Sequence, residues 1–180
     1  MFNPLVLPEL RELLHENDAV TLSEVLADLH PASIAEFTEG LSVDETWQLL
    51  SHTPIERQGE IFSFYPIPKQ VEMVHGAELA RVSKLLEVMP PDDRVDLLKQ
   101  LDPAVVEDLM PLVTKAERQD IRMLLSCPEG SAGSVMTTEY ATVPPDVTVE
   151  QAIALVRQQA PSRETIYSIY VLDQGRHLTG

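Results

Sequence analysis

Apolar residues in positions 1–126 recur at the three- and four-residue spacing of amphipathic helices, in short stretches separated by turns. The same arrangement returns about every twelve residues: an apolar residue, a turn that often contains proline, and the start of the next helix. Such turns lie at Leu29-His30-Pro31, Leu41-Ser42-Val43, Thr53-Pro54, Tyr65-Pro66, Met89-Pro90-Pro91 and Leu101-Asp102-Pro103. Proline is tolerated in the first helical turn because its missing N–H has no intrahelical partner there. The pattern therefore predicts nine or ten short helices.

Capping signals support these helix starts. In a capping box, a hydroxyl and a carboxylate three residues later each accept a hydrogen bond from the other residue's backbone N–H. Candidate boxes are Thr21/Glu24, Ser42/Glu45, Thr53/Glu56 and Thr114/Glu117. Helices of about nine residues are unstable alone in water, so many of them must stack side by side. We therefore predict a superhelix of short helices over residues 1–127, with an irregular helical bundle as the alternative.

The pattern changes after residue 127. Pro128, Gly130 and Gly133, among several hydroxyl residues, predict a linker over 128–136. Residues 137–180 then predict a truncated α/β unit. Its expected elements are a strand at Ala141–Val143, a helix capped by Thr148 and Gln151 that runs to about Ala160, a buried strand at Ile166–Leu172, and a turn at Gln174-Gly175. Half of an α/β module cannot bury its own sheet, so we expect a continuation or a partner chain to cover it.

Charge and composition narrow the choice of partners. The net charge is −16, and residues 1–60 alone carry twelve acids and two bases. A surface this acidic repels nucleic acid and attracts cations or basic proteins, so we predict no nucleic-acid partner. No run of about 18 apolar residues occurs, so this stretch of chain is not expected to span a membrane. The single cysteine is typical of a reducing compartment.

Catalytic motifs are missing from the sequence. The five histidines are scattered without metal-ligand spacing, and there is no HExxH, no GxSxG and no glycine-rich phosphate loop. The sequence therefore does not predict an enzyme.

Acidic residues at two places are candidates for a metal site. Mg²⁺ prefers oxygen ligands, keeps several waters and is often held by only one or two carboxylates. Asp92 and Asp96 lie four residues apart in PPDDRVDLL, so they share a helix face and repel each other unless a cation is near. Asp93 is adjacent, and Glu60 could approach from the helix that begins at Pro54. The alternative is structural: acids in a first helical turn interact favourably with the helix dipole and need no ligand.

Three motifs together resemble a known family. They are the junction AGSVMTTEY at Ala132–Tyr140, the segment PPDVTVEQAI that follows, and ETIYSIYVLD at residues 164–173. Placed after an acidic short-helix region, they resemble the cytosolic portion of MgtE-type magnesium transporters. The resemblance implies a right-handed, armadillo-like superhelix followed by roughly the first 45 residues of the first CBS domain. It also implies a homodimer at the cytoplasmic side of the membrane, continuing into a second CBS domain, a connecting helix and a membrane pore.

The resemblance further implies a role for the acids. By position in the motif, Glu60, Asp92 and Asp96 match the residues that hold Mg²⁺ against acids of the CBS domains, with Asp93 as a register alternative. Mg²⁺ would then close the two domains on each other and thereby close the pore. Two other functions remain open: a protein–protein interaction module like the helical repeats of the flagellar switch protein, and a sensor of adenosine nucleotides, which CBS pairs often bind.

Overall fold

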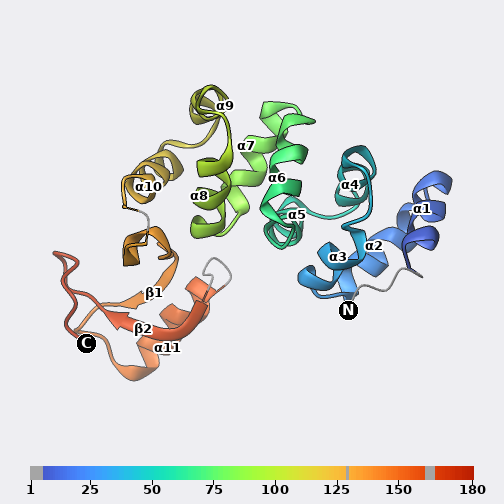
Figure 1. The fold of residues 1–180 in the computed structure, drawn as a ribbon. Helices are drawn as coiled ribbons and strands as arrows, with labels where there is room; N and C mark the ends of the chain where they lie inside the picture. Colours follow the sequence, from blue (N-terminus) through green and yellow to red (C-terminus); the bar gives the residue numbers. More distant parts are fainter. Residues whose placement is uncertain (1–5, 129, 161–164) are drawn as a thin grey trace. The chain divides into compact units, whose positions relative to one another are not determined.

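The chain divides after Pro128 into a helical unit and a smaller α/β unit (Figure 1). The computed structural model describes residues 6–128, 130–160 and 165–180. Glu129 of the predicted linker and Glu164 of the third motif lie outside the described residues. The limits that we predict for the linker, 128 and 136, remain predictions; a short 3₁₀ turn, η2 (Ala132–Ser134), lies within it.

The described residues of the helical unit form ten α-helices of 7–11 residues. They are α1 (Val6–Glu16), α2 (Ala19–Asp28), α3 (Pro31–Thr38), α4 (Val43–Leu50), α5 (Ile55–Ser63), α6 (Ile67–His75), α7 (Leu79–Val88), α8 (Pro91–Gln100), α9 (Pro103–Leu109) and α10 (Lys115–Leu125), with a 3₁₀ turn η1 (Met110–Leu112) after α9. Proline occupies one of the first two positions of α3, α6, α8 and α9. The prediction of many short helices is confirmed.

From α3 onward each helix packs against the second helix after it. The pairs are α3 with α5, α4 with α6, α5 with α7, α6 with α8, α7 with α9, and α8 with α10. Figure 1 shows the helices following one another through the unit in chain order. Contacts that recur at a fixed step are the mark of a solenoid, in which each element meets only its near neighbours.

Apolar residues from every helix of this unit form its core. Leu49 and Leu50 of α4 and Phe62 of α5 are fully buried. Trp47 is only 5% exposed and stacks on Phe62, with the ring centroids 6.0 Å apart. Its indole N–H donates to the Met73 carbonyl at 3.1 Å, so this polar atom keeps a partner in the core.

Three cations at the twelve-residue step, Arg57, Lys69 and Arg81, tie the helices together. Each donates to backbone carbonyls near the carboxyl end of an earlier helix: α2, α3 and α4 respectively. The accepting carbonyls are those of Leu26 and Leu29, of Glu39 and Leu41, and of Trp47. A helix leaves its last four carbonyls without partners and carries partial negative charge there, so a cation is stabilising at that end. These contacts therefore place three positive charges at the carboxyl ends of three helices.

Two of the predicted capping boxes are wrong. Helix α2 begins at Ala19, and its cap is Asp18, whose carboxylate accepts from the Thr21 N–H at 3.2 Å. The Thr53 hydroxyl donates backwards to the Leu50 carbonyl, and α5 starts after Pro54 without a side-chain cap. The physical reasons are a carboxylate, that of Asp18, three residues before the expected cap, and for Thr53 an acceptor in the preceding turn.

The other boxes form in full or in part. Ser42 and Glu45 make the complete box, as predicted. Thr114 caps α10 by accepting from the Glu117 N–H, but the Glu117 carboxylate pairs with Arg94 of α8 instead of returning to the cap. The backbone N–H of Thr114 is satisfied by Glu87, at the end of α7, at 3.0 Å.

The α/β unit is a single strand–helix–strand. Strand β1 (Tyr140–Val143) pairs in parallel with β2 (Thr165–Val171), and α11 (Val149–Gln159) connects them. The Thr148/Gln151 capping box forms as predicted. After β2 the chain turns at Gln174-Gly175, as predicted, and Leu172 pairs with Leu178 in an antiparallel bridge. The mainly helical fold with a small α/β unit is thereby confirmed. The prediction that the second strand is buried is wrong: Tyr167, Ile169 and Tyr170 are all exposed, because the described residues of this small unit leave these side chains uncovered.

Candidate metal-binding site

Glu60 lies in the second half of α5, with its side chain 55% exposed. Its carboxylate pairs with Arg57, one helical turn earlier, at 3.0 Å. Arg57 is itself anchored, because its other nitrogens donate to the end of α2. Glu60 is therefore an accessible carboxylate with a fixed positive charge beside it.

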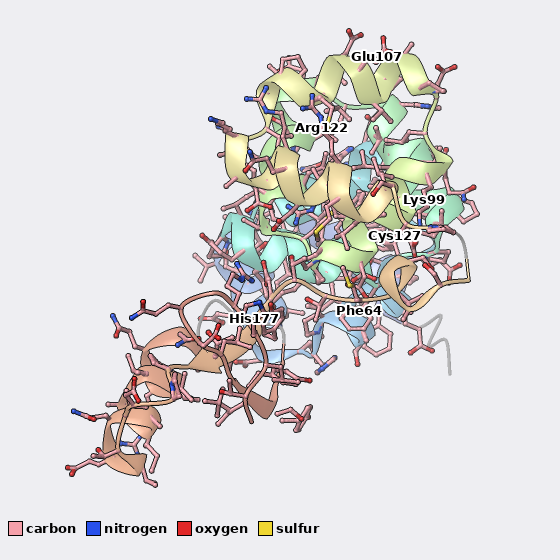
Figure 2. The ribbon with its side chains drawn as sticks, turned by 90° about the vertical axis from the view of Figure 1, so that its left-hand side faces the viewer. Phe64, Lys99, Glu107, Arg122, Cys127 and His177 are labelled. Atoms are coloured by element: carbon pink, nitrogen blue, oxygen red, sulfur yellow. The ribbon has the colours of Figure 1, made fainter. Side chains whose placement is uncertain are left out.

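Asp92 and Asp93 lie in the first turn of α8, and Asp96 follows one turn later. Asp96 is 57% exposed and pairs with Lys99 at 3.4 Å. Figure 2 shows Lys99 at the surface of the helical unit. Asp92 and Asp96 are four residues apart on one helix, so their side chains project from the same face. The structure agrees with the sequence on this arrangement.

Among the described residues, Asp92 is the one acid with a buried oxygen, Oδ1, that has no hydrogen-bond partner. Leaving a charged oxygen desolvated and unpaired is costly, and such atoms normally have a partner, a bound water or an ion. Asp92 also lies in the first turn of α8, where the helix dipole stabilises the negative charge of the carboxylate itself. A cation with its hydration waters would satisfy this oxygen, and carboxylate oxygens are the ligands that Mg²⁺ prefers.

A close contact joins the helix of Glu60 to the chain segment that leads into α8. Gly59 of α5 lies against Val88, the last residue of α7; a Cβ added at Gly59 would be 2.7 Å from the Val88 Cγ2 and 3.1 Å from its carbonyl oxygen. Glycine is needed because α5 and α7 approach this closely. Across the residues that the structure describes, no group of three or more His, Cys, Asp or Glu side chains is gathered tightly enough to hold a metal. Assignment of Glu60, Asp92, Asp96 and Asp93 as ligands remains a prediction.

Sequence reasoning missed the cations beside these acids. Arg57 precedes Glu60 by three residues, and Lys99 follows Asp96 by three, which is the spacing of neighbours on a helix. That signal was present in the sequence. The unpartnered oxygen of Asp92 could not be recognised in the sequence, because it depends on how the first turn of α8 is buried.

A second candidate site lies in the α/β unit. It is a hollow of about 460 Å³ lined mainly by aromatic and aliphatic side chains. The lining residues are Met136, Thr137, Tyr140, Tyr167, Ser168, Tyr170, Leu172 and Leu178. The Tyr140 and Tyr170 rings meet edge to face with centroids 5.6 Å apart, whereas the Tyr167 ring is 97% exposed. An exposed aromatic face of this kind is suited to stacking on a flat ring.

The fold and the acidic site define a helical-repeat domain joined to an α/β unit. The sequence profile of the MgtE intracellular N domain matches residues 29–130. The chain therefore belongs to the MgtE family.

Two relatives in this family match this chain over very different lengths. A magnesium transporter MgtE of Thermus thermophilus is 32% identical over 174 residues, which are 95% of this chain and 39% of that protein. A magnesium transporter MgtE of Enterococcus faecalis is 41% identical over 64 residues, which are 36% of this chain and 14% of that protein. The chain thus spans about two fifths of the length of the first relative.

Two solved structures share the fold. The crystal structure of the soluble part of a magnesium transporter aligns with a TM-score of 0.90 at 26% identity, covering 97% of this chain and 69% of the other. The cytosolic domain of the Mg²⁺ channel MgtE, solved in complex with ATP, aligns with a TM-score of 0.81 at 31% identity, covering 95% and 70%. Among the described residues of the present chain, every helix is too short or too polar to cross a bilayer.

Proposed function

We propose that this chain is a magnesium-sensing regulatory region of a magnesium transporter or channel, placed at the cytoplasmic side of the membrane. Mg²⁺ binds at Asp92 and Asp96, with Glu60 as a further ligand and Asp93 as the register alternative. The bound ion screens the repulsion between the acidic helical unit and the acids of the CBS domains. The two parts then close on each other, and the transporter pore closes in response. A homodimer joined through the CBS domains is the assembly in which this occurs.

The observation that carries the proposal is the buried, unpartnered Asp92 Oδ1, in a chain that belongs to the MgtE family. The supporting chemistry is the excess of acids in the helical unit and the hard, hydrated character of Mg²⁺, which a loose set of carboxylates can bind at millimolar concentration. A metal shifts such an equilibrium only by its difference in affinity for the two states, so several weak sites acting together give a steep response.

The first test is binding, measured as the rise in melting temperature when millimolar Mg²⁺ replaces Na⁺ at equal ionic strength. A ligand that binds the folded state at tenfold its Kd adds about 1.4 kcal/mol, which is a rise of a few degrees for a chain of this size. Asp92→Asn with Asp96→Asn should remove most of this rise. The matched control is Glu107→Gln with Asp108→Asn on α9, two exposed acids of the same unit, whose replacement changes the charge equally. Figure 2 labels Glu107.

The outcomes separate site binding from general screening. If the control pair loses the rise as completely as the Asp92/Asp96 pair, Mg²⁺ acts on overall charge and the assignment is wrong. The second test is closure: with both CBS domains completed, small-angle scattering should show compaction with Mg²⁺, and protease protection should increase. An unchanged scattering profile would refute the closing step while leaving the binding step to stand on its own data.

A second candidate function is binding of ATP by the α/β unit. It is favoured by the hollow beside Tyr167 and Tyr170 and by the similar cytosolic domain that was solved with ATP. Calorimetry with ATP tests it: Tyr167→Ala should abolish the heat of binding, whereas the Asp92/Asp96 variant should leave it unchanged.

A further inference from the structure

Two of the three principal candidate acids already have a positive side chain beside them. Arg57 lies 3.0 Å from Glu60, and Lys99 lies 3.4 Å from Asp96. Both acids are more than half exposed, so they are open to ions from solution. Any Mg²⁺ that binds at either carboxylate must therefore compete with a cation supplied by the protein itself.

The two cations are held in different ways. Arg57 donates through two further nitrogens to carbonyls at the end of α2, so its position is fixed. Among the described residues, Asp96 is the one hydrogen-bond partner of the Lys99 ammonium group, whose side chain is 28% exposed. A lysine ammonium on a flexible four-carbon stem turns away from a carboxylate easily, whereas an anchored guanidinium does not. Metal binding at Asp96 can thus expel Lys99, but metal binding at Glu60 must take place beside Arg57.

We propose that Lys99 is an internal counter-ion that sets the Mg²⁺ concentration at which the Asp92/Asp96 site fills. This inference rests on the proposed function. Without metal, Lys99 neutralises Asp96 and reduces the repulsion between Asp96 and Asp92. On binding, the ion takes the place of the ammonium group, which is released to water. The lysine thereby raises the threshold of the response, and Arg57 weakens the contribution of Glu60 permanently.

The experiment is a Mg²⁺ titration of melting temperature at constant ionic strength, on the chain and on single variants. Lys99→Gln should lower the midpoint concentration of Mg²⁺ about two- to five-fold, the range that an exposed ion pair is worth. Lys84→Gln is the matched control: it is an exposed lysine on the neighbouring helix α7, and its removal changes the net charge equally. The Mg²⁺ concentration at the midpoint for Lys84→Gln should stay within about 1.5-fold of the value for the unsubstituted chain. The reason is that charges farther apart than the screening length interact weakly.

Two further variants test the mechanism. Lys99→Arg keeps the positive charge and should keep the midpoint close to that of the unsubstituted chain. In the Asp96→Asn background, Lys99→Gln should cause no further shift, because the partner that it neutralises is gone. Lys99→Met serves in place of Lys99→Gln if the latter folds poorly.

Each result decides between distinct conclusions. If the unsubstituted chain shows no Mg²⁺ response, the proposed function fails at its first step. If that response is present but Lys99→Gln and Lys84→Gln have equal midpoints, or the lysine still shifts the midpoint without Asp96, the counter-ion inference is overturned and the site assignment is unaffected.

Discussion

The two units bury their apolar residues to very different degrees. The helical unit has a continuous core with residues such as Leu22, Ile61 and Leu97 completely hidden from solvent. In the α/β unit, Ala141 and Val143 of β1 are buried, but none of the eleven residues of α11, all of which are described, reaches that state. The helical unit buries its own apolar side chains through repeated contacts between helices. In the α/β unit the strands are hydrogen-bonded although much of the apolar surface is uncovered. Strand pairing therefore does not require that the apolar side chains be buried.

The largest effect is expected from separating the units. Residues 1–128 alone should unfold cooperatively on heating, because the core lies within them. Residues 129–180 alone should show no cooperative transition, because a small sheet with one uncovered face lacks the buried area for independent stability. Circular dichroism melts of both fragments give the measurement. A sharp transition in the second fragment would break the contrast between the units.

Removing the partner of a buried charge in the helical unit should lower the free energy of unfolding more than removing an exposed charge in the α/β unit. Arg94 is 1% exposed, donates to the Leu86 carbonyl at 3.0 Å and pairs with Glu117. Glu117→Ala leaves this guanidinium without its counter-charge. Because Glu117 is 29% exposed, we expect a loss of about 2–3 kcal/mol, below the roughly 3–5 kcal/mol for a fully buried pair. Urea unfolding measures the change in the free energy of unfolding.

The matched change in the α/β unit is Arg176→Ala. Arg176 donates to the Tyr140 hydroxyl at 3.0 Å in an exposed setting, so its loss should alter stability by no more than about 0.5 kcal/mol. Equal losses for the two variants would show that burial does not control the energetics of these contacts.

Alkaline pH should destabilise the helical unit through Tyr65. Burial raises the pKa of Tyr65 to about 12, and its 2.5 Å hydrogen bond with Thr38 offsets this only in part. A phenol in the unfolded chain titrates near 10, so the stabilisation is complete below about pH 10 and is lost as pH rises towards 12, by about 2–3 kcal/mol. Tyr65→Phe should be less sensitive over this range in urea unfolding. Tyr167→Phe, at a ring that is 97% exposed, should retain the original loss.

Within the helical unit, the smallest effect is expected for a methyl group at a helix crossing. Gly59→Ala places a Cβ against Val88, including its backbone, so α5 and α7 must move apart. Overpacking costs about 1–3 kcal/mol, while alanine regains up to about 1 kcal/mol of helix propensity, which leaves a net loss of about 1 kcal/mol. Gly175→Ala is the control, because its Cβ would meet only the side chains of His177 and Asp173, which are solvent-accessible, and no backbone atom. Stabilisation by Gly59→Ala would show that the crossing is looser than described.

Local signals in the sequence predicted most of the helical unit. Proline turns and the Ser42/Glu45 box mark real helix starts because they act within one turn of chain. The Thr21 and Thr53 boxes failed for a local reason too: a better acceptor, or a nearer one, took the hydroxyl or the N–H. When several neighbouring groups compete for the same hydrogen bond at a helix start, residue types alone do not show which of them forms it.

Long-range features escaped sequence analysis. The pairing of Arg94 with Glu117 joins residues 23 apart, and the step by which each helix meets the second one after it depends on how the turns direct the chain. The candidate acids were recognised from residue type and spacing, but the buried oxygen of Asp92 depends on packing. Arg57 and Lys99 were within reach of a search for opposite charges three residues apart.

The alternating contact rule from α3 to α10 also bears on how such a domain changes length over evolution. Because every helix touches the next but one, deleting or duplicating two consecutive helices would join surfaces that are already built to meet. A gain or loss of a single helix would instead place the wrong surfaces together along the remainder of the row. Homologous domains should therefore differ by pairs of helices, and an ancestral two-helix segment is the natural unit from which this architecture grew.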